Sequence, residues 1–227
     1  MIGIIGAMDI EIEHITAQMT DKEEKVISGI CYTSGKISGQ SVVTAVCGIG
    51  KVFAAMCAQT MILEYAPDAI INTGVAGTLT PNAGILDTVV ATQLVQHDVD
   101  TTYFGDPRGM ISGINVVNFP CDENLIQAVC ANIDGHFIKG TIASGDVFIA
   151  DEQRKKDIAE SFGALACEME GAAIAHVCYV NKTPFCVVRT ISDGADGDKV
   201  MSYEAFRQEA AKKSANIIIN IVKDGLK

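Results

Sequence analysis

The stretches EGAAIAHVCYV (residues 170–180) and FCVVRTI (residues 185–191) carry the pattern that decides the fold. The first is rich in alanine and has the length and composition of a tightly packed helix. The second is a short run of mostly apolar, β-branched residues, which is typical of a buried strand. Because helical patterns and short apolar runs alternate in this way along the whole chain, the sequence predicts an α/β fold with a mostly parallel central sheet.

Each element can be placed by its periodicity. The last helix is the clearest, since its apolar positions recur at three- and four-residue steps. Residues 30–47 predict a hairpin that turns at Ser38 and Gly39, which would make the sheet mixed. No linker divides the chain, so we expect one domain over residues 1–227. The expected strands are 2–6, 30–36, 41–47, 69–73, 88–95, 137–144 and 185–191, and the expected helices are 9–20, 51–65, 122–132, 151–161, 170–180 and 202–224.

Composition limits the classes of partner. The net charge is −11, and a nucleic-acid binder would normally carry a basic stripe. The dense basic cluster at residues 154–156 is expected to be a solvated helix face. The apolar stretches are too short to span a membrane, and the N-terminus lacks the basic flank of a signal peptide, so we expect a cytoplasmic protein without a membrane partner. The eight cysteines are expected to be reduced core thiols.

No cofactor or metal is expected. The four histidines have no metal-ligand spacing. Glycine-rich turns follow strands at residues 3–6, 48–51 and 74–77, but the P-loop pattern fails because Ala45 and Val52 replace its first glycine and its hydroxyl residue. A dinucleotide fingerprint is also absent. The glycines of each turn can be explained by a backbone with positive φ as well as by a bound ligand. All three turns nevertheless lie at the carboxyl ends of strands, where open α/β sheets bind ligands.

Charged residues interrupt runs that should be interior. Glu168 and Glu170 lie in a small-residue, apolar run, and Arg189 and Asp193 lie on the β-rich run that follows. Burial of an ionised group is costly unless an opposite charge or hydrogen bonds accompany it. We therefore expect Arg189 to pair with one of the two glutamates, and we expect these segments to form an active site.

Each carboxylate also has a structural explanation. Glu11 would lie in the first turn of a helix, where a negative charge is favourable, but Asp9 and Glu13 satisfy that explanation equally well. Glu170 can be an N-terminal helix acid, and Asp193 a turn or N-cap residue. Taken together, an acid, a carboxylate base and a stabiliser of positive charge indicate glycosidic cleavage through an oxocarbenium-like state. They do not name the leaving group.

Motifs spread over nearly the whole chain resemble those of the bacterial 5′-methylthioadenosine/S-adenosylhomocysteine nucleosidases of the nucleoside phosphorylase superfamily. The resemblance implies a three-layer α/β/α fold with a mixed, largely parallel central sheet. It implies hydrolysis of the N-glycosidic bond of these adenine nucleosides, and of 5′-deoxyadenosine, without a cofactor. The motifs are GIIGAM (3–8) with Glu11, CGIGKV (47–52), INTGVAG (71–77), SGDVFI (144–149), EME (168–170) and RTISD (189–193).

The resemblance also implies roles. Asp193 would be the general acid that protonates adenine at N7, and Glu11 the base that polarises the attacking water. Glu170 would accept hydrogen bonds from the ribose hydroxyls. Arg189 would orient the network of water and acid, with Glu168 supporting it. Further residues would surround the sugar, the base and the 5′ substituent: Ala76, Gly77, Phe148, Ile149, Met169 and Tyr203.

The resemblance further implies a homodimer, in which Phe104 is the candidate to reach across to the partner's site. Val75 stands where many members carry serine. A phosphate-dependent phosphorylase is disfavoured because none of the four arginines is expected near Gly6 or Gly74, and Glu11 would repel phosphate. A futalosine-type nucleoside hydrolase and a non-catalytic nucleoside-binding sensor remain alternatives.

Overall fold

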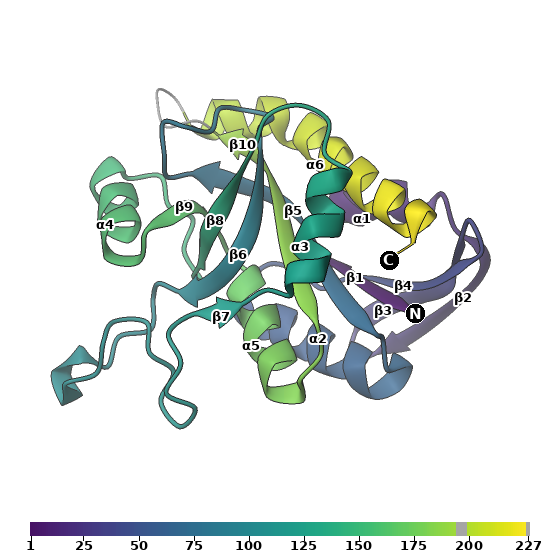
Figure 1. Cartoon of the computed structure of the whole chain (residues 1–227), viewed down its shortest axis with the longest axis horizontal. Helices are drawn as coiled ribbons and strands as arrows, with labels where there is room; N and C mark the ends of the chain where they lie inside the picture. The colour runs from purple at the N-terminus through teal and green to yellow at the C-terminus, as the bar shows by residue number, and fades with distance from the viewer. Residues whose placement is uncertain (194–198, 226–227) are drawn as a thin grey trace.

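The computed structural model (Figure 1) describes residues 1–193 and 199–225, with the backbone alone of residues 199–205. The predicted alternation of strands and helices is present, together with a short 3-10 turn, η1 (Thr102–Phe104). The strands are β1 (Ile2–Gly6), β2 (Thr20–Ile27), β3 (Ile30–Ile37), β4 (Gln40–Val46), β5 (Ala69–Thr78), β6 (Thr88–Gln96), β7 (Phe119–Pro120), β8 (Phe137–Ser144), β9 (Ala164–Glu168) and β10 (Phe185–Asp193). The helices are α1 (Asp9–Thr16), α2 (Lys51–Tyr65), α3 (Glu123–Ala131), α4 (Glu152–Phe162), α5 (Gly171–Asn181) and α6 (Lys199–Asp224).

The strands belong to one mixed sheet that partly closes on itself. The strand β5 pairs in parallel with β1 and β10 and in antiparallel with the short β9. Because β10 pairs with β6, β6 with β8 and β8 with β9, these strands form a closed ring that returns to β5. On the other side of β5 the sheet continues through β1 and β4 to β3 and β2. The hairpin of β3 and β4 confirms the turn predicted at Ser38 and Gly39.

Helices cover both faces of the sheet. On one face α2 and α5 pack against each other, and on the opposite face α1, α3 and α6 lie together (Figure 1). Along β5 and β10 the buried apolar residues alternate between these two cores, as expected for side chains that point to opposite faces. The predicted three-layer α/β/α architecture is thereby confirmed.

Some elements differ from the prediction. The strand β2 was not predicted, because its sequence TDKEEKVI buries almost no side chain and so lacks the alternation of a half-buried strand. It forms the edge of the sheet, where charged side chains are common. The strand β9 was not predicted either, because its sequence ALACE contains no β-branched or aromatic residue. The helix expected over residues 9–20 ends at Thr16, because the chain then enters β2.

The helix α4 packs against β8 and β9, and it corrects the expectation for the basic cluster at residues 154–156. Arg154 and Lys156 are exposed as expected, but Lys155 is buried together with Ile158 on the inner face of the helix. The prediction of a fully solvated helix face is therefore wrong at Lys155. The three-residue spacing to Ile158 places both side chains on one side of the helix.

Candidate active site

A cavity lies where the ends of β1, β5 and β10 meet the turn between β9 and α5. It has about 490 Å³ of empty space, open solvent included. The parallel pairing of β1, β5 and β10 carries their carboxyl ends to this edge of the sheet. The lining residues are Ala7, Met8, Glu11, Ile49, Val75, Ala76, Gly77, Phe148, Cys167, Glu168, Met169, Glu170, Ser192 and Asp193.

Glu11 is distinguished from its acidic neighbours by burial. Asp9 and Glu13 on the same helix are exposed, whereas Glu11 is 3% exposed. Its Oε2 accepts hydrogen bonds from the amides of Ala7 (2.7 Å) and Met8 (3.0 Å), and its Oε1 accepts one from the Val75 amide (3.0 Å). Burial raises the pKa of Glu11 above its ordinary value, although the nearby Arg189 charge and these amides favour the carboxylate.

Close approach to β5 is possible because residue 74 is glycine. A Cβ at Gly74 would clash with the Glu11 carboxylate and with the Arg189 guanidinium. The parallel register places Arg189 directly opposite Gly74. The expectation that no arginine lies near Gly74 is therefore wrong, because two strands far apart in the sequence are neighbours in the sheet.

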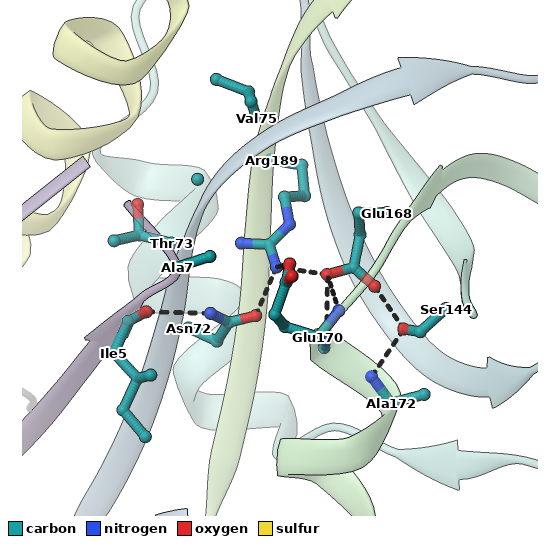
Figure 2. Close-up of polar contacts among 12 residues, drawn as sticks. Ile5, Ala7, Asn72, Thr73, Val75, Ser144, Glu168, Glu170, Ala172 and Arg189 are labelled. Atoms are coloured by element: carbon teal, nitrogen blue, oxygen red, sulfur yellow. Dashed lines mark hydrogen bonds and ion pairs between the residues drawn. The ribbon is translucent and has the colours of Figure 1, made fainter. Parts of the chain in front are cut away.

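Arg189 is held in a buried network (Figure 2). The side chain is 2% exposed and donates hydrogen bonds to the carboxylate of Glu168 and to Oδ1 of Asn72 (2.6 Å). The Glu170 carboxylate lies farther from it, at 3.9 Å. The expected pairing of Arg189 with one of the two glutamates is confirmed, and the partner is Glu168.

Glu168 uses both of its oxygens within the protein. Besides the hydrogen bond from Arg189, its carboxylate accepts hydrogen bonds from the hydroxyl of Ser144 and from the amides of Glu170 (3.1 Å) and Gly171 (2.7 Å). Figure 2 shows part of this network. Burial by itself would raise its pKa, but the Arg189 charge and these hydrogen bonds hold the pKa below the ordinary value. Glu168 is therefore a permanent carboxylate that fixes Arg189 and the start of α5.

Glu170 occupies the N-cap position of α5 and lines the cavity. Its Oε1 accepts a hydrogen bond from the amide of Gly50 (2.8 Å), in the turn that follows β4. Gly50 has a φ of +101°, a conformation that favours glycine. Burial, and then the negative charge of Glu168, raise the pKa of Glu170 to about 7.

Asp193 ends β10 and is 2% exposed. A register shift between Ile191 and Asp193 places Asp193 opposite Gly77, where a Cβ would lie 2.9 Å from the aspartate Oδ2. Burial raises the pKa of Asp193, while the Lys155 ammonium opposes that rise. A raised pKa is the direction that a carboxyl needs to act as a general acid near neutral pH.

Comparison with known proteins adds to this geometry. A model described as "Phosphorylase superfamily" matches residues 1–223. The chain belongs to the phosphorylase superfamily. It is 39% identical to the 5′-methylthioadenosine/S-adenosylhomocysteine nucleosidases of Shewanella loihica and Staphylococcus carnosus, over 98% of this chain and 98% and 99% of theirs. The resemblance to these nucleosidases is thus confirmed, and as a member of their family the chain is an N-glycosyl hydrolase.

Solved structures of similar proteins share this architecture over nearly the whole length of the chain. The nucleosidase of Neisseria meningitidis, in complex with methylthio-immucillin-A, superposes with a TM-score of 0.94 at 35% identity, with 99% of each chain covered. The futalosine hydrolase of Helicobacter pylori has a TM-score of 0.94 at 36% identity, covering 99% of this chain and 97% of that one.

Most of the residues that the sequence predicts to form the site line the cavity. Arg189 is not among the lining residues and lies behind Glu168, so it acts on the cavity through its neighbours. Ile149 is buried and lines a smaller adjoining hollow. Phe104 is 80% exposed on η1, and the cavity lining does not include it. The side chain of Tyr203 lies outside the described residues.

Several lining residues were not predicted, although each adjoins a predicted residue or lies within a quoted motif. Their position beside predicted residues could have identified them from the sequence, since a turn that places one residue at a cavity places its neighbours there as well. These residues are Ala7, Met8, Ile49, Val75, Cys167 and Ser192.

Proposed function

We propose that the protein hydrolyses the N-glycosidic bond of 5′-methylthioadenosine and S-adenosylhomocysteine, releasing adenine and the 5′-thio-ribose. The observation that carries the proposal is the meeting in one cavity of two buried carboxyls with raised pKa, Glu11 and Asp193, beside a third, Glu170. The names of the relatives at 39% identity support this choice of substrates.

In the proposed mechanism Asp193 gives its proton to N7 of adenine while the bond between C1′ and N9 breaks. The bonding electron pair passes into the purine, which leaves neutral. Glu11 takes a proton from water as the water oxygen bonds to C1′. Two amides donate to Oε2 of Glu11 and one to Oε1, which leaves one lone pair on Oε1 for the water.

Glu170 would accept hydrogen bonds from the ribose hydroxyls, and its negative charge would favour the oxocarbenium-like ribosyl group. Met169 would pack beneath the sugar and Phe148, which is 49% exposed at the cavity, would stack on the base. The remaining proposed contacts are those of the Ile149 backbone with the purine edge, of Ala76 and Gly77 with the sugar side, and of Tyr203 with the 5′ substituent.

Val75 bears on how the water is held. A serine at this position could offer a hydroxyl, which valine lacks. The Val75 amide nevertheless donates to Glu11 Oε1 at 3.0 Å. The backbone therefore orients the proposed base whichever side chain stands there, and we propose that the chemistry survives the replacement.

We propose a homodimer with adenine nucleosides as its small-molecule ligands. Large apolar side chains are exposed on α2 and α5, among them Val52, Phe53 and Tyr179, and such a patch marks an interaction surface. Phe104 of one protomer would then reach the cavity of the other. A single domain over residues 1–227 and a cytoplasmic location are part of the same proposal. Among the described residues no helix is long and apolar enough to cross a membrane.

A phosphate-dependent reaction is disfavoured by the surroundings of Arg189. Although this arginine adjoins Gly74, the carboxylates of Glu168, Glu11 and Glu170 surround its charge. A phosphate ion would meet net negative charge there, so water is the better nucleophile. Futalosine-type hydrolysis is the second candidate, because the Helicobacter pylori futalosine hydrolase matches the fold as closely as the nucleosidases do.

The test is adenine release from 5′-methylthioadenosine by the purified protein in phosphate-free buffer. Glu11→Gln and Asp193→Asn should each lose about 10²- to 10⁴-fold in rate, whereas Glu13→Gln, an exposed control on the same helix, should match the parent. Parent-like rates in both variants would refute the assigned roles, whereas no adenine release by the parent itself would favour a nucleoside-binding sensor. Strict dependence on phosphate would indicate a phosphorylase, and competition among nucleosides would rank futalosine-type substrates.

A further inference from the structure

Lys155 is a buried cation on a helix whose neighbouring charges face solvent. Its side chain is 5% exposed, while Arg154 and Lys156 on either side are exposed. Its Nζ lies 3.6 Å from Oδ2 of Asp193, whose side chain is 3% exposed. Because α4 packs against β9, the Lys155 ammonium lies beside the proposed acid of the reaction.

The carboxyl of Asp193 is enclosed on several sides. It lies against the backbone of Gly77, where a side chain would displace it, and the Ser192 hydroxyl is 3.4 Å from its Oδ1. The Cys167 thiol is close to both Lys155 and Asp193, but burial raises the pKa of that thiol to about 12, so it stays neutral over the working range. Other elements around the cavity supply the carboxyls of Glu11, Glu168 and Glu170.

We propose that Lys155 is a positioning residue for this reaction, whose ammonium holds the Asp193 carboxyl against Gly77 and stabilises the carboxylate left when Asp193 gives up its proton. The inference rests on the proposed role of Asp193 as general acid. In the step itself the Asp193 O–H bond breaks, an N7–H bond forms, and the electron pair of the breaking C1′–N9 bond enters the purine. Lys155 keeps all of its protons.

Two opposing influences then set the strength of the acid. Burial keeps the proton on Asp193 before the substrate reacts, and Lys155 makes the proton easier to release. Burial alone would make Asp193 a weaker acid, and the ammonium alone would make it a stronger one.

The test is the pH dependence of kcat/KM for Lys155→Met, since the alkaline limb of this profile reports the acid of the free enzyme. Removing the ammonium should move that limb to higher pH by about 1 to 3 pH units and lower the plateau rate. Lys155→Arg, which keeps the charge, should restore the limb. Lys156→Met, on the exposed side of the same helix, should leave it in place, and Lys155→Gln serves the same comparison should the methionine variant fail to fold.

The variant Asp193→Asn distinguishes a failure of the inference about Lys155 from a failure of the proposed role of Asp193 as general acid. If it is inactive and the limb of the neutral Lys155 variants stays where the parent has it, Lys155 does not act on the acid and the inference is overturned. If Asp193→Asn remains fully active, the proposed role of Asp193 fails first, and the inference about Lys155 falls with it.

Discussion

Replacing Glu170 by glutamine should stabilise the ligand-free protein, and do so increasingly as the pH rises. The carboxyl of Glu170 has a pKa raised from the ordinary 4.5 to about 7 by burial and by the charge of Glu168. The folded protein therefore keeps this proton at pH values where the unfolded chain has lost it. The contribution of the protonated Glu170 carboxyl to the free energy of unfolding is therefore complete below the pKa of the unfolded chain. It is lost as the pH rises through the pKa of the folded protein.

The size of the effect follows from the two values. They differ by about 2.5, and at about 1.36 kcal/mol for each pKa unit the ionised Glu170 lowers the free energy of unfolding by about 3 kcal/mol. Glutamine does not titrate, and its amide oxygen can still accept the Gly50 amide. The variant should therefore exceed the parent by up to about 3 kcal/mol near pH 8, and by almost nothing near pH 4.

Urea unfolding of the parent and of Glu170→Gln at several pH values measures this difference directly. The exposed carboxyls far from the cavity are common to both proteins, so their titration cancels in the comparison. Glu160→Gln, at a site 69% exposed on α4, is the matched control and should show no pH-dependent gain. A stability difference that is constant with pH, or that grows toward acid, would refute the raised pKa of Glu170. The gain should coincide with weaker nucleoside binding, as expected when a functional carboxylate is kept at a cost in stability.

Three further outcomes are expected. Asn72→Ala should lower the free energy of unfolding by about 1 to 3 kcal/mol in urea titrations, because Arg189 loses a buried acceptor; an unchanged midpoint would contradict the network. Gly77→Ala should lower kcat much more than the melting temperature, because the new Cβ would meet the Asp193 carboxyl at 2.9 Å, and a parent-like kcat would count against that contact. Phe104→Ala should raise KM for 5′-methylthioadenosine with little change in kcat, and unaltered KM would argue against its reach into a partner's cavity.

The resemblance to the nucleosidases was visible in the sequence because it rests on short motifs at chain turns. The strands and helices were visible because burial imposes periods of about 2 and 3.6 residues on the side chains. These two signals were sufficient for the α/β class and for most of the cavity residues. They failed for β2, whose side chains are almost all exposed, and for β9, which contains no β-branched or aromatic residue.

Charged residues within apolar runs were also a sequence-level signal, because an unpaired buried charge is too costly to keep. That signal identified Glu168, Glu170 and Arg189 as members of one site. It could not choose which glutamate pairs with the arginine. The choice of Glu168 follows from the position of β9 beside β8, which aligns Ser144 with Glu168 and directs the carboxylate toward Arg189.

The order of the elements, the nucleosidase motifs and the presence of charged residues in apolar runs are encoded in residues close together in the chain, so all three are readable without a structure. Only the tertiary structure separated Glu11 from the equally acidic Asp9 and Glu13, and only it showed that Lys155 faces Asp193. Both facts depend on which surfaces of a helix are covered by strands far away in the sequence. Burial and the distance between charges set the pKa of a carboxyl, and these quantities exist only after the chain has folded.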